Sequence, residues 1–418
     1  NSATMGRQRI IILVVILGVL FLTVGSNGAC SQGSCQAHDI CAKDSDCAVG
    51  LKCISCSSVG DMSYRCTRIS VTNPVSKVGG LPFNRYSWLT THNSFAILGE
   101  KSYTGTNRIT FSNQEDSVTN QLNNGVRGLM LDMYDFENDI WLCHSFGGNC
   151  LNFTAFMPAI NTLQEITAFL AANPSEIITI IIEDYVKAPK GLTKVFTAAG
   201  LMKYWFPVSR MPQNGEDWPT VNDMVAKNQR LIVFTSQRSK EASEGIAYEW
   251  KYVVENQYGD AGLLNGSCTN RAESKSLTSK SQSLFLENFF PTNPSQPVAC
   301  TVNSDQLSNI LSVCYKNAGE RWANFLAVDF YKRSYGGGAF QAVDELNGKL
   351  TCGCSDITEC QANGTFGVCR TSNTKVSPTG GASTQPAADA SAAPCVQCFI
   401  PFTMLLFLLH LMHLACTI

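Results

Sequence analysis

The sequence predicts an α/β fold, an irregular (β/α)8 TIM barrel that carries a small disulfide-rich extension at each end. Two observations predict the barrel: short apolar runs recur between Val78 and Lys349, and helix-like stretches lie between several of them. Continuous apolar strands are typical of parallel sheets that are covered on both faces. Eight such strands within residues 78–349 match the size and rhythm of a TIM barrel.

Each predicted strand ends abruptly in a polar or ionisable residue. The strands, with the residue that follows each, are 88–91 before His92, 129–131 before Asp132, 141–143 before His144, 177–182 before Glu183, 231–235 before Ser236, 252–254 before Glu255, 284–286 before Glu287 and 325–328 before Asp329. The predicted helices are 117–124, 159–172, 192–199, 221–227 and 304–317. The second and third strands are too close together for a helix between them, so we expect an irregular barrel. Catalytic residues of TIM barrels lie at the C-terminal ends of strands, where this sequence places its polar residues.

The N-terminal 70 residues contain two segments of different character. Two arginines precede an apolar run over 10–24, and small residues follow it, so residues 1–28 are predicted to be a secretory signal peptide. Residues 29–70 contain seven cysteines and few large apolar residues. Such a module has too little core to fold without disulfides. Because seven is odd, at least one of these cysteines is expected to pair outside the module.

The C-terminal end suggests a lipid anchor. A cluster of four cysteines over 350–370 is followed by a Ser/Ala/Pro-rich linker over 371–394 and an apolar tail over 395–418. Small residues, a spacer and a terminal apolar tail form the signal for a glycosylphosphatidylinositol (GPI) anchor, whose attachment site would lie in the linker. A single membrane-spanning helix is the alternative. Removal of the tail leaves 16 of the 19 cysteines, Cys30 to Cys369, an even number that can pair fully.

Composition predicts the compartment and excludes one class of partner. Many cysteines indicate an oxidising environment, so we expect a secreted protein on the extracellular face of the plasma membrane. Three glycosylation sequons agree with this location; they begin at Asn152, Asn265 and Asn363. The net charge of −2 and the lack of a basic run argue against nucleic-acid binding. We expect a monomer.

The candidate site contains two histidines and three oxygen donors. Only His92 and His144, of the five histidines, fall in the predicted barrel, and both follow strands. Such a pair suits a general base and a general acid near neutral pH. Asn93, Asp132 and Glu183 offer the oxygens that Ca²⁺ prefers, and a cation there would neutralise charge on a transferring phosphate. The ordinary alternatives are structural histidines and helix-capping carboxylates.

Four motifs resemble a known catalytic domain. Thr90–Phe95 resembles the His-Asn opening motif of the phosphatidylinositol-specific phospholipase C (PI-PLC) X domain, and the stretches 125–132, 142–144 and 180–183 resemble its later strand motifs. With its predicted signal peptide, cysteine module and anchor, the whole chain is similar to the plant-type secreted, GPI-anchored phospholipase-C-like phosphodiesterases.

The resemblance implies a reaction and a role for each residue. The substrate would be a membrane inositol phospholipid or a related glycolipid. His92 would deprotonate the inositol 2-hydroxyl, which attacks phosphorus, and His144 would protonate the leaving oxygen. The products would be a cyclic inositol phosphate and diacylglycerol. Asp329 would orient His92.

The resemblance also implies a calcium site, with one departure. Asn93, Asp132 and Glu183 fall on calcium-ligand positions of the eukaryotic enzymes, but Met130 stands where those enzymes have another carboxylate. Metal-independent bacterial enzymes have basic residues at the positions of Asp132 and Glu183, so the acidic residues here favour Ca²⁺.

Two other readings stay open from sequence. One is a different phosphodiesterase on the same barrel, of glycerophosphodiesterase or sphingomyelinase D type; the His-Asn opening argues against the former. The other is a catalytically inactive cell-surface scaffold or lipid-binding protein, which would have no chemical need for both histidines.

Overall fold

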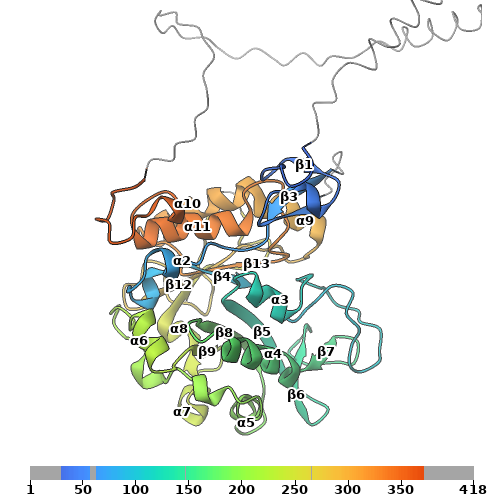
Figure 1. Ribbon diagram of the computed structural model, residues 1–418. Coiled ribbons are helices and arrows are strands. Elements are labelled where there is room, and N and C mark those ends of the chain that lie inside the picture. The colour runs from blue at the N-terminus through green and yellow to red at the C-terminus, as the bar shows by residue number, and fades with distance from the viewer. Residues whose placement is uncertain (1–29, 57–62, 146, 265, 371–418) are drawn as a thin grey trace, which may run out of the picture. The chain divides into compact units, whose positions relative to one another are not determined.

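The computed structural model describes residues 30–56, 63–145, 147–264 and 266–370 (Figure 1). The predicted signal peptide and the predicted linker and apolar tail lie outside these residues. Within the described ranges, no helix is long and apolar enough to cross a membrane.

A curled parallel sheet forms the centre of the molecule. Its strands run in the order β10, β9, β8, β5, β4, β13, β12, β11. Their bounds are β4 Trp88–Thr91, β5 Gly128–Phe136, β8 Ile178–Tyr185, β9 Leu231–Thr235, β10 Ala247–Tyr248, β11 Val253–Glu255, β12 Leu284–Asn288 and β13 Phe325–Val328. In the described part of the chain no strand pairing joins β10 to β11, so the ring is open there. The predicted fold class, an irregular TIM-type α/β barrel, is confirmed.

Helices cover the outside of the curled sheet (Figure 1). Five of them match predicted helices: α3 Val118–Asn123, α4 Ala159–Ala172, α5 Gly191–Ala198, α6 Val221–Ala226 and α10 Leu307–Asn317, which a π-helical turn precedes. Five others were not predicted: α2 Pro74–Lys77, α7 Ser239–Glu244, α8 Glu249–Tyr252, α9 Gln296–Thr301 and α11 Gly338–Thr351. The apolar spacing of α4 explains its position, because Leu163, Ile166 and Leu170 are all buried against the sheet.

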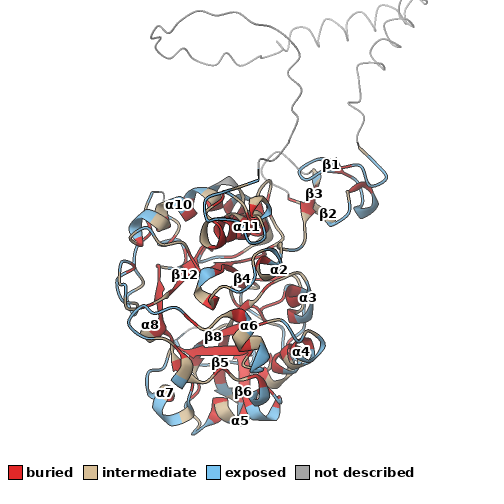
Figure 2. Cartoon of the chain, turned by 60° about the vertical axis from the view of Figure 1, so that its left-hand side comes forward, coloured by how far each residue is buried: buried red, intermediate tan, exposed pale blue. Residues whose placement is uncertain are grey.

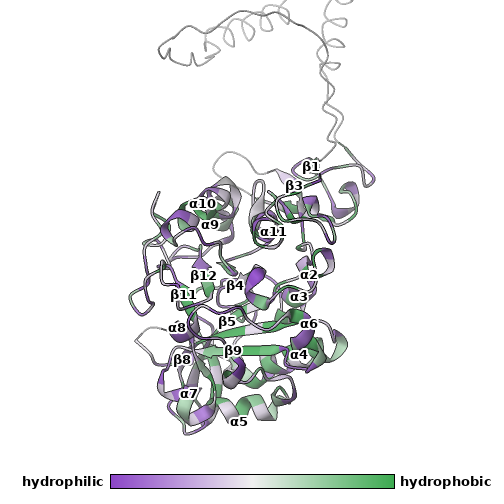
Figure 3. Cartoon of the chain, turned by 90° about the vertical axis from the view of Figure 1, so that its left-hand side faces the viewer, coloured by the Kyte–Doolittle hydropathy of each residue, from purple (hydrophilic) through white to green (hydrophobic). Residues whose placement is uncertain are grey.

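Side-chain alternation along the strands creates two cores. In β5, Leu129 and Leu131 pack in the core between sheet and helices, whereas Met130 contacts the core inside the barrel. Because both faces are covered, the strands are buried in Figure 2 and hydrophobic in Figure 3. Strands β4 and β5 approach closely at Gly128, where a Cβ atom would lie 2.2 Å from the Thr90 hydroxyl oxygen.

One predicted barrel strand is wrong. The run over 141–143 forms β6 (Asp139–Cys143), which pairs antiparallel with β5 and with β7 (Ala155–Pro158), outside the parallel path. A two-residue turn at Glu137 and Asn138, both with positive φ, joins β5 to β6 as a hairpin. The short strand β10 takes the remaining place in the barrel. An apolar run alone does not distinguish a parallel strand from an antiparallel one.

Disulfides hold both extensions. The N-terminal module is an antiparallel sheet of β1 Ile40–Cys41, β2 Leu51–Ser55 and β3 Tyr64–Arg68. All 16 cysteines from Cys30 to Cys369 are paired: Cys30–Cys35, Cys41–Cys53, Cys47–Cys66, Cys56–Cys300, Cys143–Cys150, Cys268–Cys314, Cys352–Cys360 and Cys354–Cys369. The expected bridge from the module to the barrel is therefore present, from Cys56 to Cys300 in α9.

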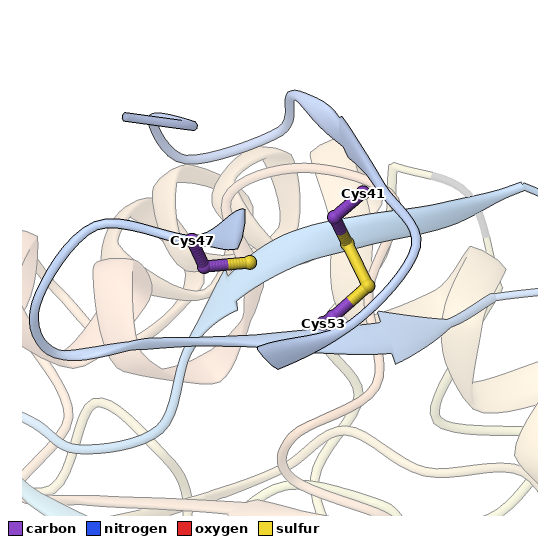
Figure 4. Close-up of side chains that lie close together, drawn as sticks. All are labelled: Cys41, Cys47 and Cys53. Atoms are coloured by element: carbon purple, nitrogen blue, oxygen red, sulfur yellow. A yellow bond between two sulfur atoms is a disulfide. The ribbon is translucent and has the colours of Figure 1, made fainter. Parts of the chain in front are cut away.

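Three neighbouring cysteines in the module look like a metal site but are not available for one. The sulfur atoms of Cys41, Cys47 and Cys53 lie within 4.8 Å of one another (Figure 4). Cys41 is bonded to Cys53, and Cys47 is bonded to Cys66. A cysteine binds a metal ion as a free thiolate, and all three of these cysteines are in disulfides. This cluster is therefore structural.

Candidate active site

A pocket of about 350 Å³ lies at the carboxyl ends of the parallel strands. Its lining includes His92, Asn93, Asp132, His144 and Glu183, the five predicted residues that were expected to face a phosphate. The parallel strands account for most of this convergence, because their carboxyl ends meet at one end of the barrel. A larger groove of about 690 Å³ beside α5 and the β5–β6 hairpin contains none of the five.

His92 is held by a buried carboxylate. Its Nδ1 atom lies 2.9 Å from Oδ1 of Asp329, which also accepts a 2.9 Å hydrogen bond from the amide of Asn113. The ring stacks on Phe290, with 3.7 Å between ring centroids. Because a carboxylate only accepts, Nδ1 carries the proton and Nε2 is left to accept another. Asn113 and Phe290 were missed from sequence because no motif marks them.

His144 reaches the pocket on the antiparallel strand. Leu142 of β6 pairs with Met133 of β5, so the hairpin returns the chain to the level of Asp132 at Cys143, one residue before His144. The Nδ1 atom of His144 lies 3.3 Å from the carbonyl oxygen of Phe111. Burial lowers the pKa of His144, and the nearby charge of His92 lowers it further. The two imidazoles therefore share one pocket, and the charge of His92 disfavours protonation of His144.

Asp132 and Glu183 form a carboxylate pair on adjacent strands. They are register partners of β5 and β8, so both face the pocket. Burial raises the pKa of Asp132 well above its usual range, the charge of Glu183 raises it further, and Arg271 opposes the rise. Among the described residues, no group donates a hydrogen bond to the Asp132 carboxylate, whereas Glu183 accepts one from the Tyr185 hydroxyl.

The amide oxygen of Asn93 adds a third donor. It is buried and has no hydrogen-bond partner in the described ranges, and its backbone is left-handed with a φ of 41°. Two carboxylates and one amide oxygen are ligands that a hard cation prefers. The poorly compensated charge of Asp132 and the unpartnered oxygen of Asn93 fit such a cation. Met130 lines the same pocket without offering an oxygen.

The opposite wall carries a charge network that the sequence did not reveal. Glu255 accepts hydrogen bonds from the Trp250 indole (2.7 Å), the Arg271 guanidinium (3.0 Å) and the Asn288 amide (2.8 Å). Arg271 lies on a loop without a motif, yet its side chain lines the pocket and is only 13% exposed. It supplies a fixed positive charge across from Asp132.

Exposed apolar side chains occur in two segments that contribute aromatic rings to the pocket. In the first, Phe111 is 38% exposed, its neighbour Ile109 is 73% exposed, and Phe153, whose carbonyl accepts from the Ile109 amide, is 41% exposed. In the second, Tyr258 is 46% exposed and Leu264, six residues later, is 57% exposed. Phe111 and Tyr258 also line the pocket itself. Exposed apolar groups in segments that line a polar site suit a substrate with a polar headgroup and an apolar body.

Comparisons with known proteins agree with this architecture. The PI-PLC X family model (PI-PLC X 1) matches residues 84–347. A PI-PLC X domain-containing protein of Arabidopsis thaliana is 56% identical over 358 residues, which are 86% of this chain and 84% of the relative. An uncharacterized secreted protein of Arthroderma benhamiae is 26% identical over 258 residues, 56% of each chain.

Two solved structures of bacterial enzymes show a distant similarity to this chain. A phosphatidylinositol-specific phospholipase C of Staphylococcus aureus has a TM-score of 0.43 at 13% identity, and that of Listeria monocytogenes has 0.42 at 16%. Each match covers 64% of this chain and 93% of the enzyme. From the family match and the 56% identity over most of its length, the chain belongs to the PI-PLC X domain family.

Proposed function

We propose that this protein is a phospholipase-C-type phosphodiesterase that cleaves an inositol phospholipid or a related glycolipid. One observation carries the proposal: His92, oriented by the buried Asp329, shares a pocket with His144. A scaffold has no need for an oriented base beside a second imidazole.

The reaction follows from the two imidazoles. Nε2 of His92 removes the proton of a substrate hydroxyl, whose oxygen then forms a bond to phosphorus. The bond from phosphorus to the lipid oxygen breaks, and His144 donates a proton to that oxygen. Burial lowers the pKa of His144, so its charged form gives up a proton readily. Asp329 stabilises the charge that His92 gains, and Arg271 opposes the negative charge on the phosphate.

We also propose that Asn93, Asp132 and Glu183 hold Ca²⁺ beside the phosphate. The ion would supply positive charge for the transferring group. The unpartnered amide oxygen of Asn93 and the raised pKa of Asp132 support this assignment. The absence of a carboxylate at Met130 predicts weaker binding than a full set of ligands would give.

Secretion and anchoring complete the proposal. Eight disulfides suit an oxidising compartment, and the apolar ends of the sequence suit a cleaved signal peptide and a GPI anchor on the extracellular face. A similar protein from Arthroderma benhamiae is described as secreted. The exposed apolar side chains of the segments that line the pocket support a membrane-borne substrate.

The decisive experiment compares the wild type with His92→Ala on vesicles of phosphatidylinositol and of a glycosylated phosphatidylinositol. We expect wild-type release of cyclic inositol phosphate and a loss of about 10²- to 10⁴-fold in kcat for the variant. His38→Ala, a histidine of the cysteine module, is the matched control and should retain activity. Equal activity of His92→Ala and the wild type would exclude the catalytic reading. Vesicle binding by an inactive wild type would favour the lipid-binding scaffold.

A further inference from the structure

The acid candidate His144 lies in a segment with little regular structure to hold it. It directly follows β6 and begins a loop that the Cys143–Cys150 disulfide closes. Gly147 and Gly148 in this loop have φ values of 67° and 73°. Glycines in the left-handed region leave the free chain many conformations, so the loop needs an external constraint to stay in one of them.

One half of the disulfide is anchored in a packed cluster. Cys143 is fully buried together with Tyr134, Trp141 and Ala155, and Cys150 packs at the edge of this cluster. Cys143 also pairs with Ala155 of β7. The bond therefore fixes the loop end at Cys150 to a rigid part of the sheet.

The segment after Cys150 leads back to His144 through backbone hydrogen bonds. The Thr154 amide donates to Leu151 (2.8 Å), and the His144 amide donates to the Thr154 carbonyl (3.1 Å). The Phe153 carbonyl accepts from the amide of Ile109 (2.7 Å). Segment 150–154 thus contacts both His144 and the start of segment 109–111.

Segment 109–111 holds the ring and the backbone of His144. The Thr110 hydroxyl donates to the His144 carbonyl at 2.6 Å, and the Phe111 carbonyl lies 3.3 Å from Nδ1 of His144. A carbonyl only accepts, so this contact places a proton on Nδ1 and directs Nε2 to the pocket. A continuous path of contacts therefore leads from the disulfide to the tautomer of His144.

We propose that the Cys143–Cys150 disulfide is a positioning element of the site. It keeps segments 150–154 and 109–111 against His144, and so fixes the orientation from which this imidazole donates its proton. The proposal rests on the proposed role of His144 as the acid. The sequence does not distinguish this disulfide from the others, whereas its contacts with the segments around His144 give it a function.

The test is the double variant Cys143→Ala with Cys150→Ala. Its matched control is Cys352→Ala with Cys360→Ala, because the separations of 7 and 8 residues close loops of similar entropy. We expect the first variant to lose about 10- to 100-fold in kcat, with KM changed by less than about twofold. The control should keep both parameters. A folded first variant with wild-type kcat would overturn the proposal.

A second readout does not depend on turnover. In the wild type, histidine NMR should show His144 titrating below the ordinary pKa, because burial lowers it. We expect its pKa to return toward the ordinary value in the first variant but not in the control. The barrel contains only His92 and His144, which simplifies assignment. An unchanged titration would contradict the proposal.

A single substitution provides the test if the double variant does not fold. Thr110→Val keeps the disulfide and removes the hydroxyl that donates to His144. We expect a smaller fall in kcat and a shift of the His144 titration in the same direction, and no change in either would overturn the path. If the wild type hydrolyses none of the lipids, the proposed function fails while the titration still tests positioning.

Discussion

The two walls of the pocket place buried carboxylates in opposite situations. On one wall the Asp132 carboxylate receives no hydrogen bond within the described residues, and its pKa is raised. On the other, Glu255 accepts three hydrogen bonds and pairs with Arg271. Both acids directly follow an apolar run and look alike in sequence. Their partners distinguish them: a satisfied acid maintains the fold, whereas an unsatisfied one is available to a ligand.

The largest expected effect comes from removal of Glu255, the carboxylate that accepts three hydrogen bonds. Glu255→Ala leaves Arg271 buried without its main partner, so we expect the free energy of unfolding to fall by about 3–5 kcal/mol. Urea denaturation measures this loss. Glu273→Ala is the control, because Glu273 pairs with the same arginine but is 51% exposed. A loss for Glu255→Ala no larger than that for the control would contradict the comparison.

A second buried carboxylate, that of Glu287, extends the comparison to a residue that does not line the pocket. Glu287 of β12 is buried, neither of its oxygens has a partner in the described part of the chain, and burial raises its pKa to about 8. Between its ordinary pKa and 8 the unfolded chain loses this proton while the folded chain keeps it, so stability falls as pH rises. Between pH 5 and pH 7.5 the free energy of unfolding of the wild type should fall by about 3 kcal/mol because of Glu287, and Glu287→Gln should not show this part of the fall. Urea denaturation at both pH values checks this, and equal pH slopes for variant and wild type would disprove it.

The third prediction concerns Asp132, the carboxylate that receives no hydrogen bond within the described residues. Asp132→Asn removes a buried carboxylate that receives no hydrogen bond in the described ranges and that Arg271 compensates only in part, so we expect the metal-free protein to gain about 1–2 kcal/mol at neutral pH. The folded pKa is raised, so the gain should vanish in acid, where both states are protonated. Addition of Ca²⁺ should raise Tm in the wild type but not in the variant. A wild-type Ca²⁺ response in Asp132→Asn would refute the assignment.

The smallest effect compares two exposed apolar side chains, one in the segment of Phe111 and one in the segment after Tyr258. Ile109→Ser and Leu264→Ser each remove one of them. If these segments face the lipid surface, each substitution should weaken partition into anionic vesicles by about fivefold, or roughly 1 kcal/mol. Sedimentation with vesicles measures this. Val49→Ser, fully exposed in the cysteine module, is the control and should have no effect.

Sequence reasoning succeeded where local pattern determines structure. Apolar runs located the strands, and the common end of parallel strands then brought His92, Asp132 and Glu183 to one pocket. It failed where long-range contacts decide: the run before His144 is an antiparallel hairpin, and Arg271 enters the pocket from a loop without a motif. Disulfide pairing also lay beyond it, because cysteine count constrains pairing without specifying it. Only the odd number in the N-terminal module pointed to the bridge that leaves it.

The Cys56–Cys300 bridge can form only after most of the chain has been synthesised. Cys56 and Cys300 are 244 residues apart, so at 5–20 residues per second the second sulfur follows the first by roughly 12–50 s. During this interval the six other cysteines of the module have local partners, and Cys56 has none. The module therefore carries one unpaired thiol among newly formed bonds until α9 arrives. Correct maturation depends on an isomerase that reverses wrong pairs, or on local bonds that close first and stay closed.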